Sequence, residues 1–394
     1  MGYLDVPEIS RFTSRHGMVT MESGDAADGK QHSEDAAAFK DLPAAGPIPA
    51  QSLRTRSAIA LGGLAGNNAH GAGFLEALRR SGKMPQLVTC TSGQILHVAK
   101  WLQGVDMHAF FEESILQTQP FGDWLDANLI FKQLSANSQV IRPSTQEFPY
   151  DVLGAVTRSW VKAWTDPKNF SMFRELYNVM PARSLVPAFP PDFHSGIAAA
   201  LNDTEVGVVF NAYNFDDGHE YVYMNKAALK LTGKSLGRHG AKSWIDYQPI
   251  TAATAEQALY LYQYGFKTST QTVDGAYVRD VILSEIPSQN NEIDRIAAVR
   301  PQPDNWLGGP PMSNVELQSL QTQVGFNATY IGERERIRLM NRLSGQLKWD
   351  VQPKQVSILE LPLAEPRTWW DYVVESEQIF RSAFWRGVEL VKYL

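Results

Sequence analysis

The segment TCTSGQ, residues 89–94, contains a serine. An apolar segment precedes this serine, and apolar residues at helical spacing follow it. A sharp turn from a strand into a helix raises a serine hydroxyl into a cleft beside backbone N–H donors, as in a nucleophile elbow. The segment departs from the Gly-x-Ser-x-Gly pattern, because Cys90 and Gln94 occupy the outer glycine positions. Ser92 is therefore a candidate nucleophile. The alternative is a serine that only caps the following helix, a position that serine favours.

Gly62 and Gly63 open a glycine-rich segment, GGLAGNNAHGAG at 62–73, directly after the apolar run 57–61. Glycine lets the backbone turn its N–H groups toward an anion, and the N-terminus of the helix that follows adds partial positive charge. The segment fits an oxyanion hole and a dinucleotide pyrophosphate equally well. A dinucleotide fold would also show Gly-x-Gly-x-x-Gly and an acidic residue ending the next strand, but that strand runs into residues 89–91, TCT.

A third motif lies far along the chain, where Asp274 ends a short strand and is followed by Gly275. On its own it predicts only a β-turn. Taken in order, the three motifs resemble those of the patatin-like phospholipase family, which has a G-G-G-x-[RK]-G loop, a G-x-S-x-G elbow and a late D-G-[GA] aspartate. The resemblance covers about residues 56–300.

The chain departs from the family pattern in the loop and in the elbow. Leu64 replaces the third glycine of the loop, although its backbone N–H is kept. Gly66, Asn67 and Asn68 stand where the family has an arginine or lysine. Gln94 is the larger departure in the elbow, because its side chain could crowd the strand and the helix.

The resemblance implies a three-layer α/β/α fold with a mostly parallel central sheet, and a serine hydrolase that cleaves acyl esters of phospholipids or other lipids without a cofactor or metal. Ser92 would attack the acyl carbonyl and Asp274 would act directly as the general base, with no histidine. Backbone N–H groups of Gly62, Gly63, Leu64 and Gly93 would form the oxyanion hole. A carboxylate with an ordinary pKa of ~3.9 is a weak base toward a hydroxyl, so burial or a short hydrogen bond should assist Asp274.

Strand and helix patterns alternate along the chain, which favours an α/β sheet domain. Residues 1–55 are expected to form an arm, partly disordered, because few of them are large and apolar. Residues 56–300 form the expected catalytic domain, in which 101–195 are an insertion or a lid-like region with a helix near 152–164. Residues 301–394 are expected to form a mainly helical extension packed on that domain, with a helical stretch at 315–343 that Gly325 could break.

Composition excludes several classes of protein. The 394 residues include a single cysteine, which excludes an intramolecular disulfide and a thiolate zinc cluster. The formal net charge of −6 disfavours nucleic-acid binding. The sequence has neither a secretory signal nor an apolar run long enough for a membrane span, so we expect a cytoplasmic protein, with transient contact at a membrane surface where it meets its lipid.

Other interpretations stay open. His70 or His97 could approach Ser92, but a hydrolase triad in the order Ser, Asp, His needs a histidine after Asp274, and the last one is His239. A catalytically weak or inactive family member would bind a lipid or a protein partner, and a nucleotide-binding oxidoreductase would use the glycine segment. A thiol nucleophile at Cys90, in contrast, is disfavoured because small buried cysteines usually pack in the core. Aromatic clusters such as the one at 160–164 fit core packing or a lipid-facing patch.

Overall fold

The apolar run 57–61 forms strand β2 (Ser57–Leu61), in which every residue is buried. Ile59 and Leu61 enter the hydrophobic core on one side of the sheet, and Ala58 and Ala60 enter the core on the other side. A strand that is apolar on both faces is typical of a parallel sheet covered by helices on both sides. The predicted strand is confirmed, and its neighbours extend the same arrangement.

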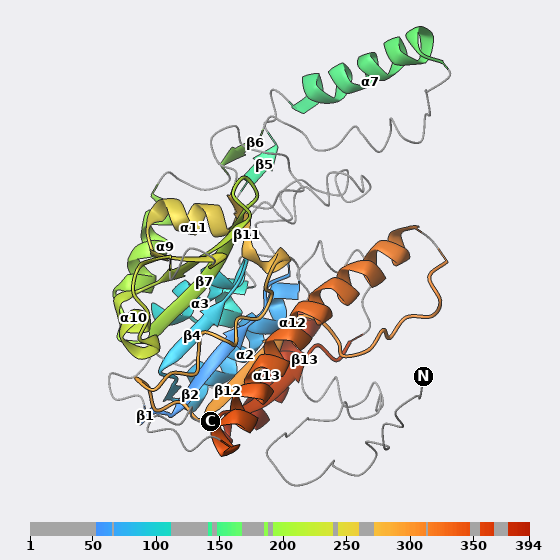
Figure 1. Ribbon diagram of the computed structural model, residues 1–394. Helices are drawn as coiled ribbons and strands as arrows, with labels where there is room; N and C mark the ends of the chain where they lie inside the picture. Colours follow the sequence, from blue (N-terminus) through green and yellow to red (C-terminus); the bar gives the residue numbers. More distant parts are fainter. Residues whose placement is uncertain are drawn as a thin grey trace, which may run out of the picture.

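The computed structural model describes residues 53–64, 67–111, 141–143, 148–167, 185–187, 192–238, 243–259, 272–312, 314–346, 355–365 and 377–394. Within these residues, nine strands form one mixed, mostly parallel sheet in an α/β fold (Figure 1). Along the sheet the strands are β13 (Ser357–Pro362), β12 (Arg295–Arg300), β2, β4 (Leu87–Cys90), β7 (Gly207–Asn214), β8 (His219–Met224), β10 (Ile245–Pro249) and β9 (Gly237–Arg238), with β11 (Thr272–Asp274) paired to β7.

The pairing directions of the strands show which strand ends meet at the same edge of the sheet. Strands β13, β12, β2, β4 and β7 run parallel to their neighbours in that order. The hairpin of β7 and β8 is antiparallel, and β11 pairs antiparallel with β7. The carboxyl ends of β2, β4 and β12 therefore meet at one edge of the sheet, where loops in parallel sheets usually carry functional groups.

Helices cover both faces of the sheet. One core contains residues of α2 (Asn68–Ser81), α3 (Gln94–Leu102), α9 (Phe193–Asn202), α11 (Ala252–Ala258) and α13 (Glu377–Val391). The other contains residues of α10 (Lys226–Thr232) and α12 (Asn314–Gln346). Three layers result, helices, sheet and helices, with α12 and α13 reaching the sheet from the far end of the sequence (Figure 1).

The C-terminal region supplies both a long helix and a strand of the sheet. The helical stretch near 315–343 is one continuous helix, α12, and Gly325 does not break it, because glycine weakens a helix without removing a hydrogen bond. Residues after 300 also supply β13, which pairs with β12, so this region completes the sheet as well as adding helices. The arm before residue 53 lies outside the described residues, and the domain boundaries stay a prediction.

The aromatic clusters have different environments. Phe111 is fully buried in the core. The expected helix near 152–164 is α7 (Phe148–Thr165), and its Trp160 and Trp164 are 66% and 79% exposed. The clusters at 260–264 and 369–370 lie outside the described residues. Within the described part of the chain, no helix combines the length and the apolar character that a membrane span needs.

Candidate active site

Ser92 occupies the sharp turn between β4 and α3. Its φ of 54° is the one positive value among the described non-glycine residues. Such a conformation costs a serine ~1–3 kcal/mol and persists where the surrounding structure enforces it. The N–H of Gln94 bonds the Thr91 carbonyl at 3.1 Å, and the N–H of Ile95 bonds the Ser92 carbonyl at 3.0 Å, so the first bonds of α3 close the turn.

Gly63 allows the loop after β2 to pass directly beside this turn. A Cβ atom at position 63 would lie 2.1 Å from the Thr91 carbonyl oxygen and 2.6 Å from the Ser92 Cβ. These distances are far below van der Waals contact, so no other residue fits without moving the backbone. The glycine segment and the serine turn, separated by about thirty residues in the sequence, therefore form one unit.

Asp274 is the last residue of β11, opposite Ala212 of β7, and is 1% exposed. One of its carboxylate oxygens accepts the Ala276 N–H at 2.9 Å. The Ser92 side chain also hydrogen-bonds to this carboxylate. Burial raises the pKa of Asp274 to about 7, although both hydrogen bonds act in the opposite direction. The structure thus brings the two residues named from the sequence into direct contact.

The N–H groups expected to bind an oxyanion are mostly engaged within the protein. Gly62 donates to the Val299 carbonyl at 2.9 Å, Gly63 to Thr91 Oγ1 at 2.8 Å and Leu64 to Asn68 Oδ1 at 3.0 Å. Among described residues, Gly93 is the member of the expected set whose N–H donates to no other residue. It lies at the N-terminus of α3, where the helix dipole favours an anion.

Gln94 fits the elbow because α2 makes room for it. The side chain is fully buried, and its Nε2 donates to the Asn68 carbonyl at 3.0 Å. A Cβ atom on Gly71 of α2 would lie 2.3 Å from the Gln94 amide. A glycine on the neighbouring helix therefore supplies the space that a glycine within the elbow would otherwise leave.

The other nucleophile and base candidates have different surroundings. His70 Nε2 pairs with the Leu361 carbonyl at 2.9 Å, and His97 Nδ1 with Gln94 Oε1 at 3.3 Å. Burial lowers the pKa of His97 to about 4. Cys90 is fully buried in β4, and burial raises the pKa of its thiol, which keeps it a packing residue.

A buried polar network, not anticipated from the sequence, holds the segment that follows Asp274. Asn211 of β7 donates from Nδ2 to the Gly275 carbonyl at 3.2 Å, to the Arg279 carbonyl at 3.3 Å and to Glu220 Oε1 at 2.8 Å. A Cβ on Gly275 would lie 2.3 Å from the Asn211 Cγ. The turn after Asp274 is thus fixed against the sheet by one amide.

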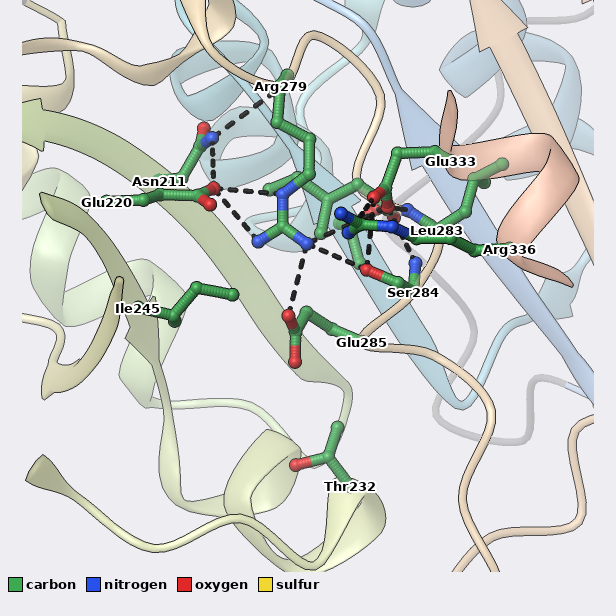
Figure 2. A network of polar contacts seen from close by, with 12 residues as sticks. Asn211, Glu220, Thr232, Ile245, Arg279, Leu283, Ser284, Glu285, Glu333 and Arg336 are labelled. Carbon is green, nitrogen blue, oxygen red and sulfur yellow. Dashed lines mark hydrogen bonds and ion pairs between the residues drawn. The ribbon is translucent and has the colours of Figure 1, made fainter. Parts of the chain in front are cut away.

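Arg279 is the centre of this network (Figure 2). Its guanidinium bonds Glu220 at 2.9 Å and Glu285 at 3.1 Å, and lies 3.7 Å from Glu333 of α12. Burial would lower the pKa of Arg279, but the three carboxylates outweigh it and raise that pKa. For Glu220 burial acts in the other direction and raises the pKa, and the charge of Arg279 offsets this only in part. The sequence feature that could have indicated this network is the Arg–Asp pair at 279–280, which stands between apolar residues.

Within the described residues, no group of three or more His, Cys, Asp or Glu side chains is placed to hold a metal ion. A dinucleotide pyrophosphate would need the same loop N–H groups as an oxyanion. Those of Gly62 and Gly63 donate within the protein, so no observation favours nucleotide binding.

No protein-family model and no curated protein matches the sequence. Among solved structures, the chain is similar to the crystal structure of VipD from Legionella pneumophila, with a TM-score of 0.30 and 10% identity. The match covers 86% of this chain and 66% of the VipD chain, just under two thirds of its length. At this TM-score the similarity carries no argument about fold or function, which must come from the motifs and the site.

Proposed function

We propose that this chain is a patatin-like serine hydrolase that cleaves acyl esters of lipids through Ser92 and Asp274. The observation that carries the proposal is a serine held at φ 54° between a strand and a helix, with its side chain hydrogen-bonded to a buried aspartate. A strained serine paired with a basic group is the arrangement expected of an activated nucleophile. The lipid class of the substrate rests on the order of the three sequence motifs.

In the proposed reaction, Ser92 Oγ attacks the acyl carbonyl while its proton passes to Asp274. The tetrahedral intermediate collapses to an acyl-enzyme, and Asp274 returns the proton to the leaving alcohol. Water, deprotonated by the same carboxylate, then attacks the acyl-enzyme, and Asp274 returns that proton to Ser92 Oγ as the carboxylic acid leaves. A pKa near 7 suits Asp274 to both directions of this proton transfer, because a general acid–base group works best near the operating pH.

The oxyanion would be stabilised first by the Gly93 N–H at the start of α3. The Gly63 N–H would join it if the bond to Thr91 Oγ1 is exchanged for one to the oxyanion when substrate binds. Catalytic hydrogen bonds often take their final geometry only in the complex with substrate. Loss of one such donor typically lowers the rate by ~10²–10³-fold.

The test is active-site labelling with a fluorophosphonate together with turnover of p-nitrophenyl esters. We expect the probe to label the wild-type protein and not Ser92→Ala, with turnover lowered at least about 10³-fold in the variant. Ser81→Ala, which removes an exposed serine hydroxyl at the end of α2, is the matched control and should keep both properties. Equal labelling or equal turnover in Ser92→Ala contradicts the proposal.

A second function is favoured by the engaged loop: a catalytically inactive protein that binds an acyl lipid. The N–H groups of Gly62, Gly63 and Leu64 all donate internally, which leaves a weak oxyanion hole unless the loop moves. Such a protein would leave Ser92 unlabelled, and a fatty-acyl ligand would still raise the melting temperature. Labelling of Ser92 decides for the hydrolase.

A further inference from the structure

Asp280 lies where the three motifs meet. The Thr91 hydroxyl, one residue before the candidate nucleophile, donates to the Asp280 carbonyl at 2.8 Å. The Gly63 N–H hydrogen-bonds to the Asp280 carboxyl in addition to Thr91 Oγ1. A Cβ atom on Gly62 would lie 2.9 Å from Asp280 Oδ2. This carboxyl therefore touches the glycine loop, while its own backbone supports the serine turn.

The surroundings of this carboxyl disfavour a negative charge. Asp280 is 2% exposed, and its Oδ1 has no hydrogen-bond partner among the described residues. A buried carboxylate oxygen without a partner is costly in the charged state, and much less so in the neutral acid.

Two charged groups face Asp280 from neighbouring strands, Asp274 on β11 and Arg300 on β12. Burial is the largest influence and raises the pKa of Asp280 well above its usual range; Arg300 lowers it in part, and Asp274 raises it further. Arg300 cannot fully compensate, because its guanidinium also pairs with Glu360 at 3.4 Å and donates to the Asn327 side chain at 2.8 Å.

We propose that Asp280 is a positioning residue of the candidate active site that works as the neutral acid, holding Gly62 and Gly63 beside Ser92, and that its ionisation sets the alkaline limit of the reaction. The proposal rests on the hydrolase function proposed above. It adds a second carboxyl group with a task opposite to that of the first: Asp274 must be charged to accept a proton, and Asp280 must stay neutral.

Ionisation of Asp280 would weaken the reaction for a definite electrostatic reason. The transition state carries a developing negative charge beside the glycine loop, and a charged Asp280 would place a second one against that same loop. Like charges in a buried site repel strongly because little water screens them. Asp274 ionises first as the pH rises, and its charge then delays the ionisation of Asp280.

The first test compares pH profiles of kcat for the wild type and Asp280→Asn, which keeps the shape and removes the ionisation. We expect the wild-type rate to fall about tenfold per pH unit on its alkaline side, and the variant to stay within about twofold of its maximum over the same pH range. Asp216→Asn, the same change at an exposed hairpin position, should keep the wild-type profile. A wild-type profile without an alkaline fall, or the same fall in Asp280→Asn, overturns the proposal.

The second test measures melting temperature against pH and needs no catalysis. An acid whose pKa is raised on folding destabilises the protein increasingly as the pH rises above its unfolded pKa, near 4. The melting temperature of Asp280→Asn should therefore rise relative to that of the wild type as the pH increases above about 5, and by more than that of Asp216→Asn. A constant difference for Asp280→Asn above pH 6 means that Asp280 is already charged, and overturns the proposal.

The outcomes separate this inference from the proposed function. If Ser92→Ala keeps full turnover, the hydrolase function fails together with the alkaline limit assigned to Asp280, whereas a growing melting-temperature difference would still show that Asp280 is neutral in the folded protein. If Ser92→Ala is inactive and the melting-temperature difference is constant, the hydrolase stands and the role of Asp280 fails.

Discussion

Asp274 owes its proposed chemistry to its surroundings. An exposed aspartate is fully ionised and nearly non-basic at neutral pH, whereas burial raises the pKa of this one to about 7. The hydrogen bonds from Ser92 and the Ala276 N–H act against burial and keep the charged form accessible. A single carboxyl group can then accept the serine proton without a histidine between them.

This balance predicts the acid side of the pH profile. The base is the deprotonated carboxylate, so kcat for ester hydrolysis should rise with pH through about 7 and fall about tenfold per unit below it. Asp274→Asn should lower kcat at least about 10³-fold with the melting temperature kept or raised, because the amide removes a buried ionisable group. Steady-state kinetics from pH 4.5 to 9 checks both expectations. A limb near pH 4, or an active Asp274→Asn, would rule out this carboxyl as the base.

At the scale of elements, α2 shapes the site because its glycines have no side chain, which lets neighbouring groups approach closely. Gly71 makes room for the Gln94 side chain of the elbow. Gly73, one half-turn further, faces α13: a Cβ there would lie 2.1 Å from the Phe380 carbonyl oxygen. The first helix of the sheet domain and the last helix of the chain thus touch backbone to backbone.

Two glycine-to-alanine changes in helices should therefore have opposite signs. Gly73→Ala should lower the free energy of unfolding by about 1–3 kcal/mol or more, because α13 must move away from α2. Gly325→Ala in α12 should raise it by about 0.5–1 kcal/mol, because no atom of the described residues lies within 4 Å of its missing Cβ and alanine favours the helix. Urea unfolding of both variants measures the two changes. Destabilisation by Gly325→Ala would mean that this face of α12 is covered.

At the scale of the whole molecule, the Arg279 network joins parts that are distant in sequence. Glu220 comes from β8, Glu285 from the segment that follows Asp274, and Glu333 from α12 (Figure 2). One cation therefore links the sheet, the proposed catalytic segment and the C-terminal region. Burial would raise the pKa of Glu285, yet the charges of Arg279 and Lys234 outweigh it and hold that pKa below its usual range.

Removing this cation should destabilise the fold as a whole. Arg279→Met removes the buried cation that three buried carboxylates share, and we expect a loss of about 3–5 kcal/mol in the free energy of unfolding. Arg336→Met is the matched control, since Arg336 pairs with the same Glu333 at 3.0 Å but is 54% exposed, and should cost at most about 1 kcal/mol. Chemical denaturation gives both values. Equal effects of the two variants would contradict a central role for Arg279.

Much of the sheet was predictable because its strands are short apolar runs bounded by turn residues. The strand at 57–61 is confirmed on that basis. The continuity of α12 through Gly325 could not be predicted, because a glycine alone does not show whether a helix ends. The place of the edge strand β13 beside β12 depends on long-range pairing that no local pattern encodes.

Within the site, the sequence named Ser92 and Asp274, and the structure places them in contact; their catalytic roles remain a proposal. The loop donors could not be judged in advance, because the partners of Gly63 and Leu64 depend on which side chains the fold brings near. Asp280 was missed for a similar reason: a carboxyl near another charged residue looks like a surface pair until its burial is known.

The backbone at Ser92 has a consequence for how this chain can change over time. A φ of 54° suits glycine, so a mutation of Ser92 to glycine would relieve strain and is favoured by folding. A serine in this place keeps the strain, and the proposed use of its hydroxyl would explain why it is there. If a descendant of this protein kept the fold but gave up chemistry, position 92 is where its sequence would be freed to change first.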